Sequence, residues 1–303
     1  MKCLITFFLV VIAQHIFSQK KMILDSISIL KEKGEIKHAI TISERIPKDS
    51  LTNYECLNIA ELHNILGNKN EALYYLELVF QKDSLFKDIW NFSKTNSYEL
   101  LKEERFQRLC DVIVSNSKKN KTCDKKIMHQ LLEMLCRDRS YYYQVYMSEN
   151  KLGKFHPISL ALWDFKERIN LENIELLDSI TSKLGWLTDT LVCDYSGIPF
   201  FIVQHADLVT QKRYLPIITR ATELGTANFN WVAMLTDRIC LREGKPQIYG
   251  SQGIWNPNIN RNVLYIIENK EEVNRLRAKH KIGDPISDES FKNMYDPNNP
   301  LNK

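Results

Sequence analysis

The sequence lacks the motifs that would assign a chemistry at once. It contains no Gly-x-Ser-x-Gly, no phosphate-binding glycine-rich loop, no dinucleotide fingerprint and no His-Glu-x-x-His, so the familiar reaction classes have no support. No Cys-x-x-Cys pair and no Cys/His spacing typical of zinc occurs. We therefore predict neither a cofactor nor a resident metal.

An excess of charge of one sign is also missing. The 41 Lys and Arg residues are nearly balanced by 37 Asp and Glu residues, which leaves a net charge of +4. That balance, without a basic stripe interleaved with aromatic residues, argues against nucleic-acid binding. With 303 residues and 44% hydrophobic content, the chain is long enough for two globular domains.

Apolar runs long enough to span a bilayer are absent after the first residues. Lys2 precedes an apolar run over residues 4–13, which is too short to span but suits a secretory signal peptide. We predict a signal peptide over residues 1–19 and a mature chain starting near Gln19 or Lys20. The mature protein is then expected to be soluble, periplasmic or secreted, and without membrane contact. Its oligomeric state is left open.

Six cysteines remain after this cleavage, and export would permit disulfides. Cys110, Cys123 and Cys136 lie close enough in sequence for one pair to form among them. Cys110 and Cys240 also lie on apolar helical faces, which favours a role as plain core residues.

Two segments of the amino-terminal half repeat at a fixed period. Gly34-x-x-x-x-Ala39 recurs as Gly67-x-x-x-x-Ala72, a spacing typical of helix–turn–helix solenoids. With Ala60, the second copy closely resembles a tetratricopeptide repeat, in which small residues let two helices approach. A third copy near residues 100–113 is degenerate, because Arg105 stands where a small residue is expected.

We predict that residues 20–115 form a short helical solenoid of this type and that residues 116–126 form a linker. Such a solenoid could bind an extended peptide or protein partner, or it could only support the neighbouring domain.

The carboxy-terminal half is also expected to be mainly helical, giving a mostly α fold with a small β element. Helical periodicity covers residues 128–135 with an extension to Tyr142 and Tyr146, then residues 171–184, 208–223 with a kink or restart at Pro216, and 229–243 capped by Asn228. Strand character is confined to residues 247–249 and 262–267. The sequence from Gly283 looks loosely ordered, with a flexible tail over residues 296–303 and with Phe291 and Tyr295 as its anchors.

Four motifs in this half resemble a bacterial family known only as a domain of unknown function. They are Val203-Gln204-His205-Ala206-Asp207, Gln211-x-x-x-Leu215-Pro216, Leu235-Thr236-Asp237-Arg238 and Gly244-x-Pro246-Gln247-x-Tyr249-Gly250-Ser251-Gln252. Ser251 replaces the threonine that the family usually has, which keeps the hydroxyl. The resemblance covers residues 126–295 and implies a fold neighbourhood, not an activity.

The same segments place charged and polar groups in apolar surroundings, where each needs a partner. We predict that eight of them converge in one polar site. The candidate catalytic residues are His205, Asp207, Asp237 and Arg238, and the candidate ligand-binding residues are Gln204, Gln247, Tyr249 and Gln252. On a helix, Gln204 and Asp207 would share a face.

Three interpretations of this cluster stay open. A histidine near a carboxylate, with an arginine to hold an anion, is the minimal equipment for a hydrolase-like enzyme. The same groups could bind a ligand without chemistry. They could also form a buried network, with Asp207 capping a helix and Gln247 and Gln252 tying down a loop. A metal held by His205, Asp207 and Asp237 is conceivable but has only one histidine to support it.

Overall fold

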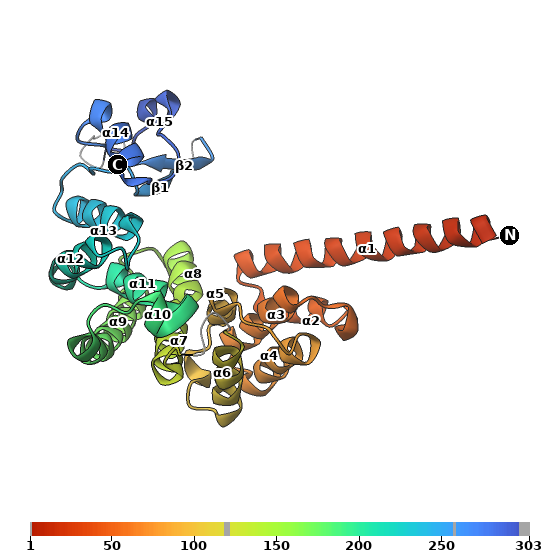
Figure 1. The fold of residues 1–303 in the computed structure, drawn as a ribbon. Coiled ribbons are helices and arrows are strands. Elements are labelled where there is room, and N and C mark those ends of the chain that lie inside the picture. The colour runs from red at the N-terminus through yellow and green to blue at the C-terminus, as the bar shows by residue number, and fades with distance from the viewer. Residues whose placement is uncertain (1, 118–121, 257–258, 297–303) are drawn as a thin grey trace. The chain divides into compact units, whose positions relative to one another are not determined.

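The computed structural model describes residues 2–117, 122–256 and 259–296. It is 71% helical, and its described residues form a single two-stranded sheet, which confirms a mostly α fold with a small β element. The chain divides into two compact units, Met1–Ile169 and Asn170–Lys303 (Figure 1). The border lies inside a long helix, so it does not coincide with the linker expected at residues 116–126.

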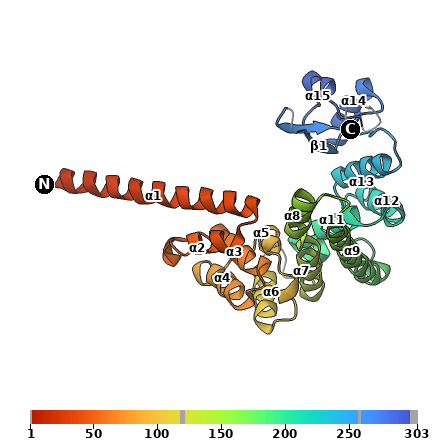
Figure 2. The same cartoon turned by 180° about the vertical axis from the view of Figure 1, so that it is seen from behind.

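The first unit consists of helices and short 3₁₀ turns: α1 (Lys2–Lys33), α2 (Ile36–Ser43), η1 (Lys48–Ser50), α3 (Asn53–Ile65), α4 (Lys69–Lys82), α5 (Ile89–Phe92), η2 (Ser93–Thr95), η3 (Tyr98–Leu100), α6 (Glu104–Asn116), α7 (Lys125–Arg139) and α8 (Tyr142–Leu152). Helix α9 (Pro157–Leu184) begins in the first unit and ends in the second. Both ribbon views show α1 extending far beyond α2 and α3 at its amino-terminal end (Figures 1 and 2).

The same turn joins the helices of the first two pairs. Gly34 and Gly67 both have a left-handed backbone, with φ of 79° and 75°. In each turn the residue after glycine donates its N–H to the carbonyl five positions back, and glycine donates to the carbonyl three positions back. The first of these bonds measures 2.8 Å from Glu35 to Leu30 and 2.9 Å from Asn68 to His63. The 33-residue period in the sequence is thus a repeat of backbone geometry.

Small residues lie where these helices approach one another. Ala39, Ala60 and Ala72 are all fully buried. Helix α3 also begins with a capping box, in which Thr52 accepts the N–H of Glu55 while the Glu55 carboxylate accepts the N–H of Thr52. Tight helix contact and a defined start explain why this stretch folds as paired helices.

The degenerate third copy departs from the first two. Its first helix is replaced by the short α5 and two 3₁₀ turns, with Asn96 in a left-handed conformation at φ 52°. Its second helix, α6, forms as expected. Arg105 does not enter a helix interface as alanine would. Its guanidinium instead reaches the Glu77 carboxylate of α4, at 2.7 and 2.8 Å.

Helix α7 carries the predicted apolar face, and Met128, Leu131, Leu132 and Leu135 are all buried. The predicted extension of this face to Tyr142 and Tyr146 is wrong. The left-handed Tyr141, at φ 68°, separates α7 from α8 and turns the chain, so both tyrosines remain exposed.

The second unit contains α10 (Asp189–Val192), η4 (Cys193–Tyr195), α11 (Gly197–His205), α12 (Leu208–Glu223), α13 (Phe229–Arg242), β1 (Gly253–Asn256), β2 (Arg261–Leu264), α14 (Lys270–His280) and α15 (Asp288–Lys292). Helices α12 and α13 pack against each other, as both views show (Figures 1 and 2). Asn228 caps α13 as predicted. Helix α12 runs through Pro216 without a break, so the restart predicted as one possibility there is wrong, and the kink stays a prediction.

The small sheet pairs β1 with β2 in antiparallel register, from Gly253 opposite Leu264 to Asn256 opposite Arg261. The strand predicted at residues 247–249 is wrong, because Gln247 forms only an isolated bridge with Ile267. Ile267 packs in a small core with Val273 and Ile286. The apolar side chains of this segment thus pack against Val273 of α14 and not within a longer sheet.

The sequence after Gly283 is more ordered than expected up to residue 296. Phe291 of α15 packs against the small core, and the N–H of Tyr295 donates to the Leu264 carbonyl at 2.7 Å. Both predicted anchors therefore hold this segment. The rest of the predicted flexible tail, residues 297–303, lies outside the described residues.

Cys123 and Cys193 are disulfide-bonded, whereas Cys56, Cys110, Cys136 and Cys240 are free. The predicted pairing among Cys110, Cys123 and Cys136 is therefore wrong. Cys110 and Cys136 are fully buried among apolar side chains of α6 and α7, where burial raises the pKa of each thiol. Among the described residues, no helix meets both the length and the apolarity needed to cross a membrane.

Candidate functional site

The predicted site residues all lie in the second unit, and the first group surrounds Asp237. This aspartate is on α13 and is fully buried. Its Oδ1 accepts the N–H groups of Ile248 at 2.7 Å and Tyr249 at 2.9 Å, and its Oδ2 accepts the N–H of Ser251 at 2.8 Å. We call residues Gln247–Gln252, which fold around this carboxylate, the Asp237 turn.

Burial and hydrogen bonding act in opposite directions on Asp237. Burial raises the pKa of its carboxyl above the usual value, and the N–H groups of the turn only partly offset this effect. On the other side of the turn, the Arg277 guanidinium donates to the Tyr249 carbonyl at 2.9 Å and to the Asp284 carbonyl at 2.8 and 3.0 Å. Burial lowers the pKa of Arg277, and the nearby Asp237 charge opposes that shift. The turn is therefore held between a buried carboxylate and a half-buried cation.

Gln247 and Gln252 close the Asp237 turn on itself. The fully buried Gln247 amide donates to the carbonyls of Gln252 at 3.1 Å and Tyr265 at 2.8 Å, and it accepts the N–H of Gln252 at 2.9 Å. The Gln252 amide in turn donates to the Met234 carbonyl of α13 at 3.3 Å. Both side chains thus use their polar atoms to satisfy backbone groups.

The Tyr249 ring belongs to an aromatic group formed by α13 and α14. Its centroid lies 5.7 Å from Phe229 and 6.5 Å from His280, edge-on to both, while Phe229 and His280 stack with centroids 3.7 Å apart. Burial raises the pKa of Tyr249 and lowers that of His280. These shifts favour the neutral form of both side chains at neutral pH.

The second group of predicted residues lies where α11 meets α12. The Gln204 carbonyl accepts from the Gln211 amide at 2.8 Å, and the His205 carbonyl accepts from the Asn170 amide at 3.1 Å. The His205 ring meets Phe201 edge-on at 4.6 Å. Carboxamides from α9 and α12 thus satisfy the carbonyls at the end of α11.

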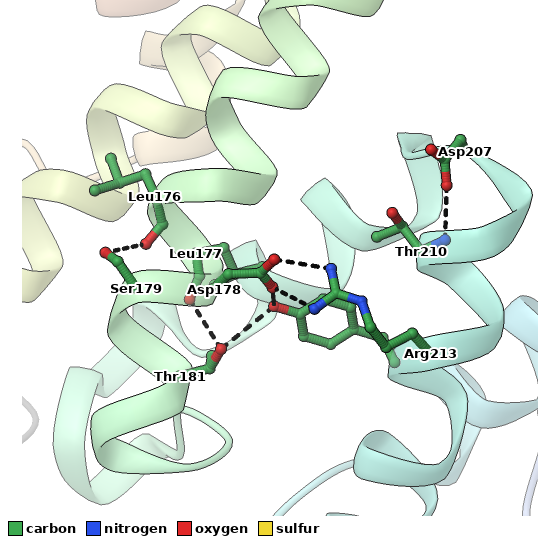
Figure 3. Close-up of polar contacts among 9 residues, drawn as sticks. Leu176, Leu177, Asp178, Ser179, Thr181, Asp207, Thr210 and Arg213 are labelled. Atoms are coloured by element: carbon green, nitrogen blue, oxygen red, sulfur yellow. Dashed lines mark hydrogen bonds and ion pairs between the residues drawn. The ribbon is translucent and has the colours of Figure 1, made fainter.

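Asp207 is the N-cap of α12, where its Oδ1 accepts the Thr210 N–H at 2.6 Å (Figure 3). The expectation that Gln204 and Asp207 share one helical face is therefore wrong, because α11 ends at His205 and a new helix starts after Asp207. Arg238 is half-buried beside Asp237. Another arginine of α13, Arg242, reaches the α11–α12 junction and donates to the Ala206 carbonyl at 2.6 Å.

The structure thus brings four of the eight predicted residues together: Gln247, Tyr249 and Gln252 belong to the Asp237 turn, and Asp237 of α13 accepts its N–H groups. The bonds of Gln204, His205 and Asp207 run to α9 and α12. Convergence of all eight residues stays a prediction. Among the described residues, no group of three or more His, Cys, Asp or Glu side chains could hold a metal.

Sequence reasoning missed a polar cluster that links α9 to α12. Asp178 receives two bonds from the Arg213 guanidinium, at 2.8 and 2.9 Å (Figure 3). It also accepts one from the Tyr214 hydroxyl. Burial would raise the pKa of Asp178, but the bonds from Arg213 and Tyr214 bring it below its usual value. Burial and Asp178 together raise the pKa of Tyr214 to about 12. The only signal is that residues 171–184 include three acidic residues in an apolar pattern, which does not identify the partner of any of them.

Comparison with known families finds a match to the Family of unknown function (DUF6624) over residues 130–297. The chain belongs to this family. The match covers more than half of the chain and includes the Asp237 turn, the α11–α12 junction and the Asp178 cluster. DUF6624 thus begins in α7, before the border between the two units, so the family boundary follows neither that border nor any helix end. Neither the curated proteins nor the solved structures contain a match to the chain.

Proposed function

We propose that this protein is an exported binding module whose paired helices hold an extended peptide. The observation that carries the proposal is a groove of about 390 Å³ between α1 and α3. Its lining combines the polar side chains of Asp25, Ser28 and Asn58 with the Tyr54 ring, which is 59% exposed. Polar groups beside an exposed aromatic suit a peptide backbone and its side chains.

Ion pairs between α1 and α3 hold the two walls of this groove together. Lys20 pairs with Glu55 at 2.7 Å and Lys31 with Glu61 at 2.6 Å. The resemblance to tetratricopeptide repeats, supported by the matching turns at Gly34 and Gly67, favours a binding surface of this kind. A groove with fixed walls loses little conformational entropy when it binds.

Export is part of the proposal, with cleavage near Gln19. Lys20, which would then be at the start of the mature chain, is already tied to the body by Glu55 and by the Ser50 carbonyl at 2.6 Å. The disulfide-bonded Cys123 and Cys193 favour an oxidising compartment. Intact-mass analysis of protein recovered from its native host tests this point, because retention of Lys2 would contradict it.

The alternative, a hydrolase-like enzyme using His205, Asp207, Asp237 and Arg238, receives less support from the contacts. Both oxygens of Asp237 accept N–H groups from the Asp237 turn, and Asp207 caps α12. We propose that these carboxylates have a structural role in the DUF6624 domain. That role leaves the groove between α1 and α3 as the better candidate for binding.

Selection of peptides from a random display library on the full chain tests the peptide-binding proposal. Wild type should enrich a common sequence, and Tyr54→Ala should weaken binding of the enriched peptide about tenfold, because an aromatic contact is lost. Tyr74→Ala is the matched control, since Tyr74 is a half-exposed tyrosine of α4 that does not line this groove. Absence of enrichment, or equal loss in both variants, would contradict peptide binding in the groove.

A further inference from the structure

The loop between α8 and α9 exposes large apolar side chains to solvent. Phe155 is 90% exposed, and Leu152 and Ile158 on either side of it are 47% and 53% exposed. Single exposed apolar residues are ordinary, but several of them together mark an interaction surface. We call residues 151–163 the α8–α9 tip.

The tip is fixed by its own hydrogen bonds. Gly153 adopts φ 95°, and its carbonyl accepts the His156 N–H at 3.2 Å and the hydroxyl of the buried Ser159 at 2.9 Å. The His156 ring accepts the Ile158 N–H at 3.2 Å. Phe155 lies inside this turn but makes few contacts with it, as its 90% exposure shows. The turn thus holds Phe155 outward without needing it for packing.

The first turns of α9 expose two further large apolar side chains. Leu160 is 46% exposed and Trp163 is 39% exposed. The Trp163 indole N–H donates to the Glu149 carboxylate at 2.8 Å while much of the ring remains open. A tryptophan with a bonded polar end and an open apolar face is typical of a membrane–water interface.

The charge of the tip has one sign. No acidic residue occurs between Glu149 and Asp164, whereas Lys151 and Lys154 are both exposed. Lysines beside exposed aromatic and aliphatic side chains complement a surface that is negatively charged outside and apolar beneath. A bilayer with anionic phospholipid has this composition.

We propose that the α8–α9 tip docks on the surface of an anionic phospholipid bilayer. Phe155, Leu152 and Ile158 enter the headgroup region, and Lys154 contacts lipid phosphates. An interfacial membrane anchor needs only a few apolar side chains with basic residues beside them, and the tip offers both. This contact is peripheral, and it departs from the sequence-based expectation that the mature chain makes no membrane contact.

Vesicle co-sedimentation of the full chain tests the proposal. Binding should be stronger to phosphatidylcholine–phosphatidylglycerol vesicles than to phosphatidylcholine alone, and it should weaken with salt. Phe155→Ser and Lys154→Glu should each reduce binding to the anionic vesicles about tenfold. The first removes the ring that enters the bilayer, and the second reverses the charge that faces the lipid phosphates. Val209→Ser is the matched control, since Val209 of α12 is a 76% exposed apolar residue outside the tip. It should leave binding unchanged.

A position-specific probe keeps the test valid if residues 4–13 also hold the chain on vesicles. An environment-sensitive fluorophore on the thiol of Phe155→Cys, with Cys3 and Cys240 changed to serine, should shift its emission to the blue on anionic vesicles. The same fluorophore on Val209→Cys should not shift. An unshifted emission at the tip, or equal shifts at both positions, would overturn the proposal. So would self-association in solution that Phe155→Ser abolishes, because the tip would then be a protein contact.

Discussion

Two kinds of turn in this protein satisfy their backbone in opposite ways. The turns at Gly34 and Gly67 bond their N–H groups to carbonyls of the helix that they end, within five residues along the chain. The Asp237 turn directs three N–H groups to one buried carboxylate, 11 to 14 residues away on another element. The first kind is a local solution that a short sequence encodes. The second depends on one side chain of a folded helix.

This difference predicts where each region is vulnerable. A local turn loses little when one side chain changes, because its bonds are between backbone groups. A turn organised by one carboxylate loses several bonds at once when that carboxylate changes. Substitutions that remove the organising group from each kind of turn can test the comparison.

Asp237→Asn should produce the largest effect, a loss of about 2–4 kcal/mol in the free energy of unfolding. The remaining side-chain oxygen can still accept from Ile248 and Tyr249, but the new NH₂ group faces the N–H of Ser251. Urea denaturation followed by circular dichroism measures the loss.

Asp207→Asn is the matched control for this substitution. Asparagine caps helices about as well as aspartate, so the change should cost no more than about 0.5 kcal/mol. Equal losses in the two variants would refute the special role of the Asp237 turn. A stable Asp237→Asn protein that has lost a biological activity would instead support the catalytic interpretation.

The same contrast explains what the sequence could predict. The positions of Gly34, Gly67, Ala39 and Ala72 follow from a period that is visible in the residues themselves, so the paired helices were predicted. The polar residues near Asp237 were found because their chemistry is unusual in apolar sequence. Their partners were not found, since Arg277 is 40 residues further along the chain and its bonds go to backbone carbonyls.

The errors have equally specific causes. The sequence predicts one helix for Gln204 and Asp207, because no glycine or proline marks the break between α11 and α12, where Asp207 itself starts the new helix. Residues 247–249 look like a strand, but only Gln247 donates its N–H to the neighbouring segment, at the Ile266 carbonyl, whereas Ile248 and Tyr249 donate theirs to Asp237. In both places a polar side chain decides the backbone path against the local pattern.

Glycine substitutions sharpen the comparison with a smaller expected effect. Gly67 and Gly250 both have a left-handed backbone, with φ of 75° and 66°. A Cβ on Gly67 would meet nothing within 4 Å, whereas one on Gly250 would lie 2.3 Å from the Ile286 Cδ1. Gly67→Ala should therefore cost about 1 kcal/mol from the backbone alone, and Gly250→Ala about 2 kcal/mol because Ile286 must also move.

Urea denaturation of both glycine variants beside wild type measures this difference. The Ile286 methyl group is the far end of a side chain, so the additional cost should not exceed that of a modest repacking. Equal costs for the two variants would show that the Asp237 turn accommodates a side chain as readily as the turn between α3 and α4.

A distant side chain also satisfies a helix end in the first unit. Lys166 of α9 is 1% exposed, and its ammonium donates to the carbonyls of Asp138 and Ser140 at the end of α7. Its Nζ also lies 4.2 Å from the centroid of the Tyr142 ring. Burial lowers the pKa of Lys166 to about 8, although the Asp138 charge opposes the shift. The unit with local turns thus contains one site that resembles the Asp237 turn, with a buried cation in place of a buried anion.

Because of Lys166, raising the pH should increase the free energy of unfolding. Between the folded pKa of about 8 and the ordinary value near 10.5, the unfolded chain keeps the Lys166 proton and the folded chain has released it. Because the unfolded state then binds more protons, the free energy of unfolding rises with pH, by at most about 1.4 kcal/mol per pH unit.

The neutral amine still donates to both carbonyls, so deprotonation removes a desolvated charge without breaking the helix end. We expect the advantage of wild type over Lys166→Met to grow by about 2 kcal/mol between pH 7.5 and pH 9.5 in urea denaturation, since other titrating groups cancel between the two proteins. A constant or shrinking difference would mean that Lys166 stays protonated in the folded state, held by these carbonyls as firmly as the N–H groups of its turn hold Asp237.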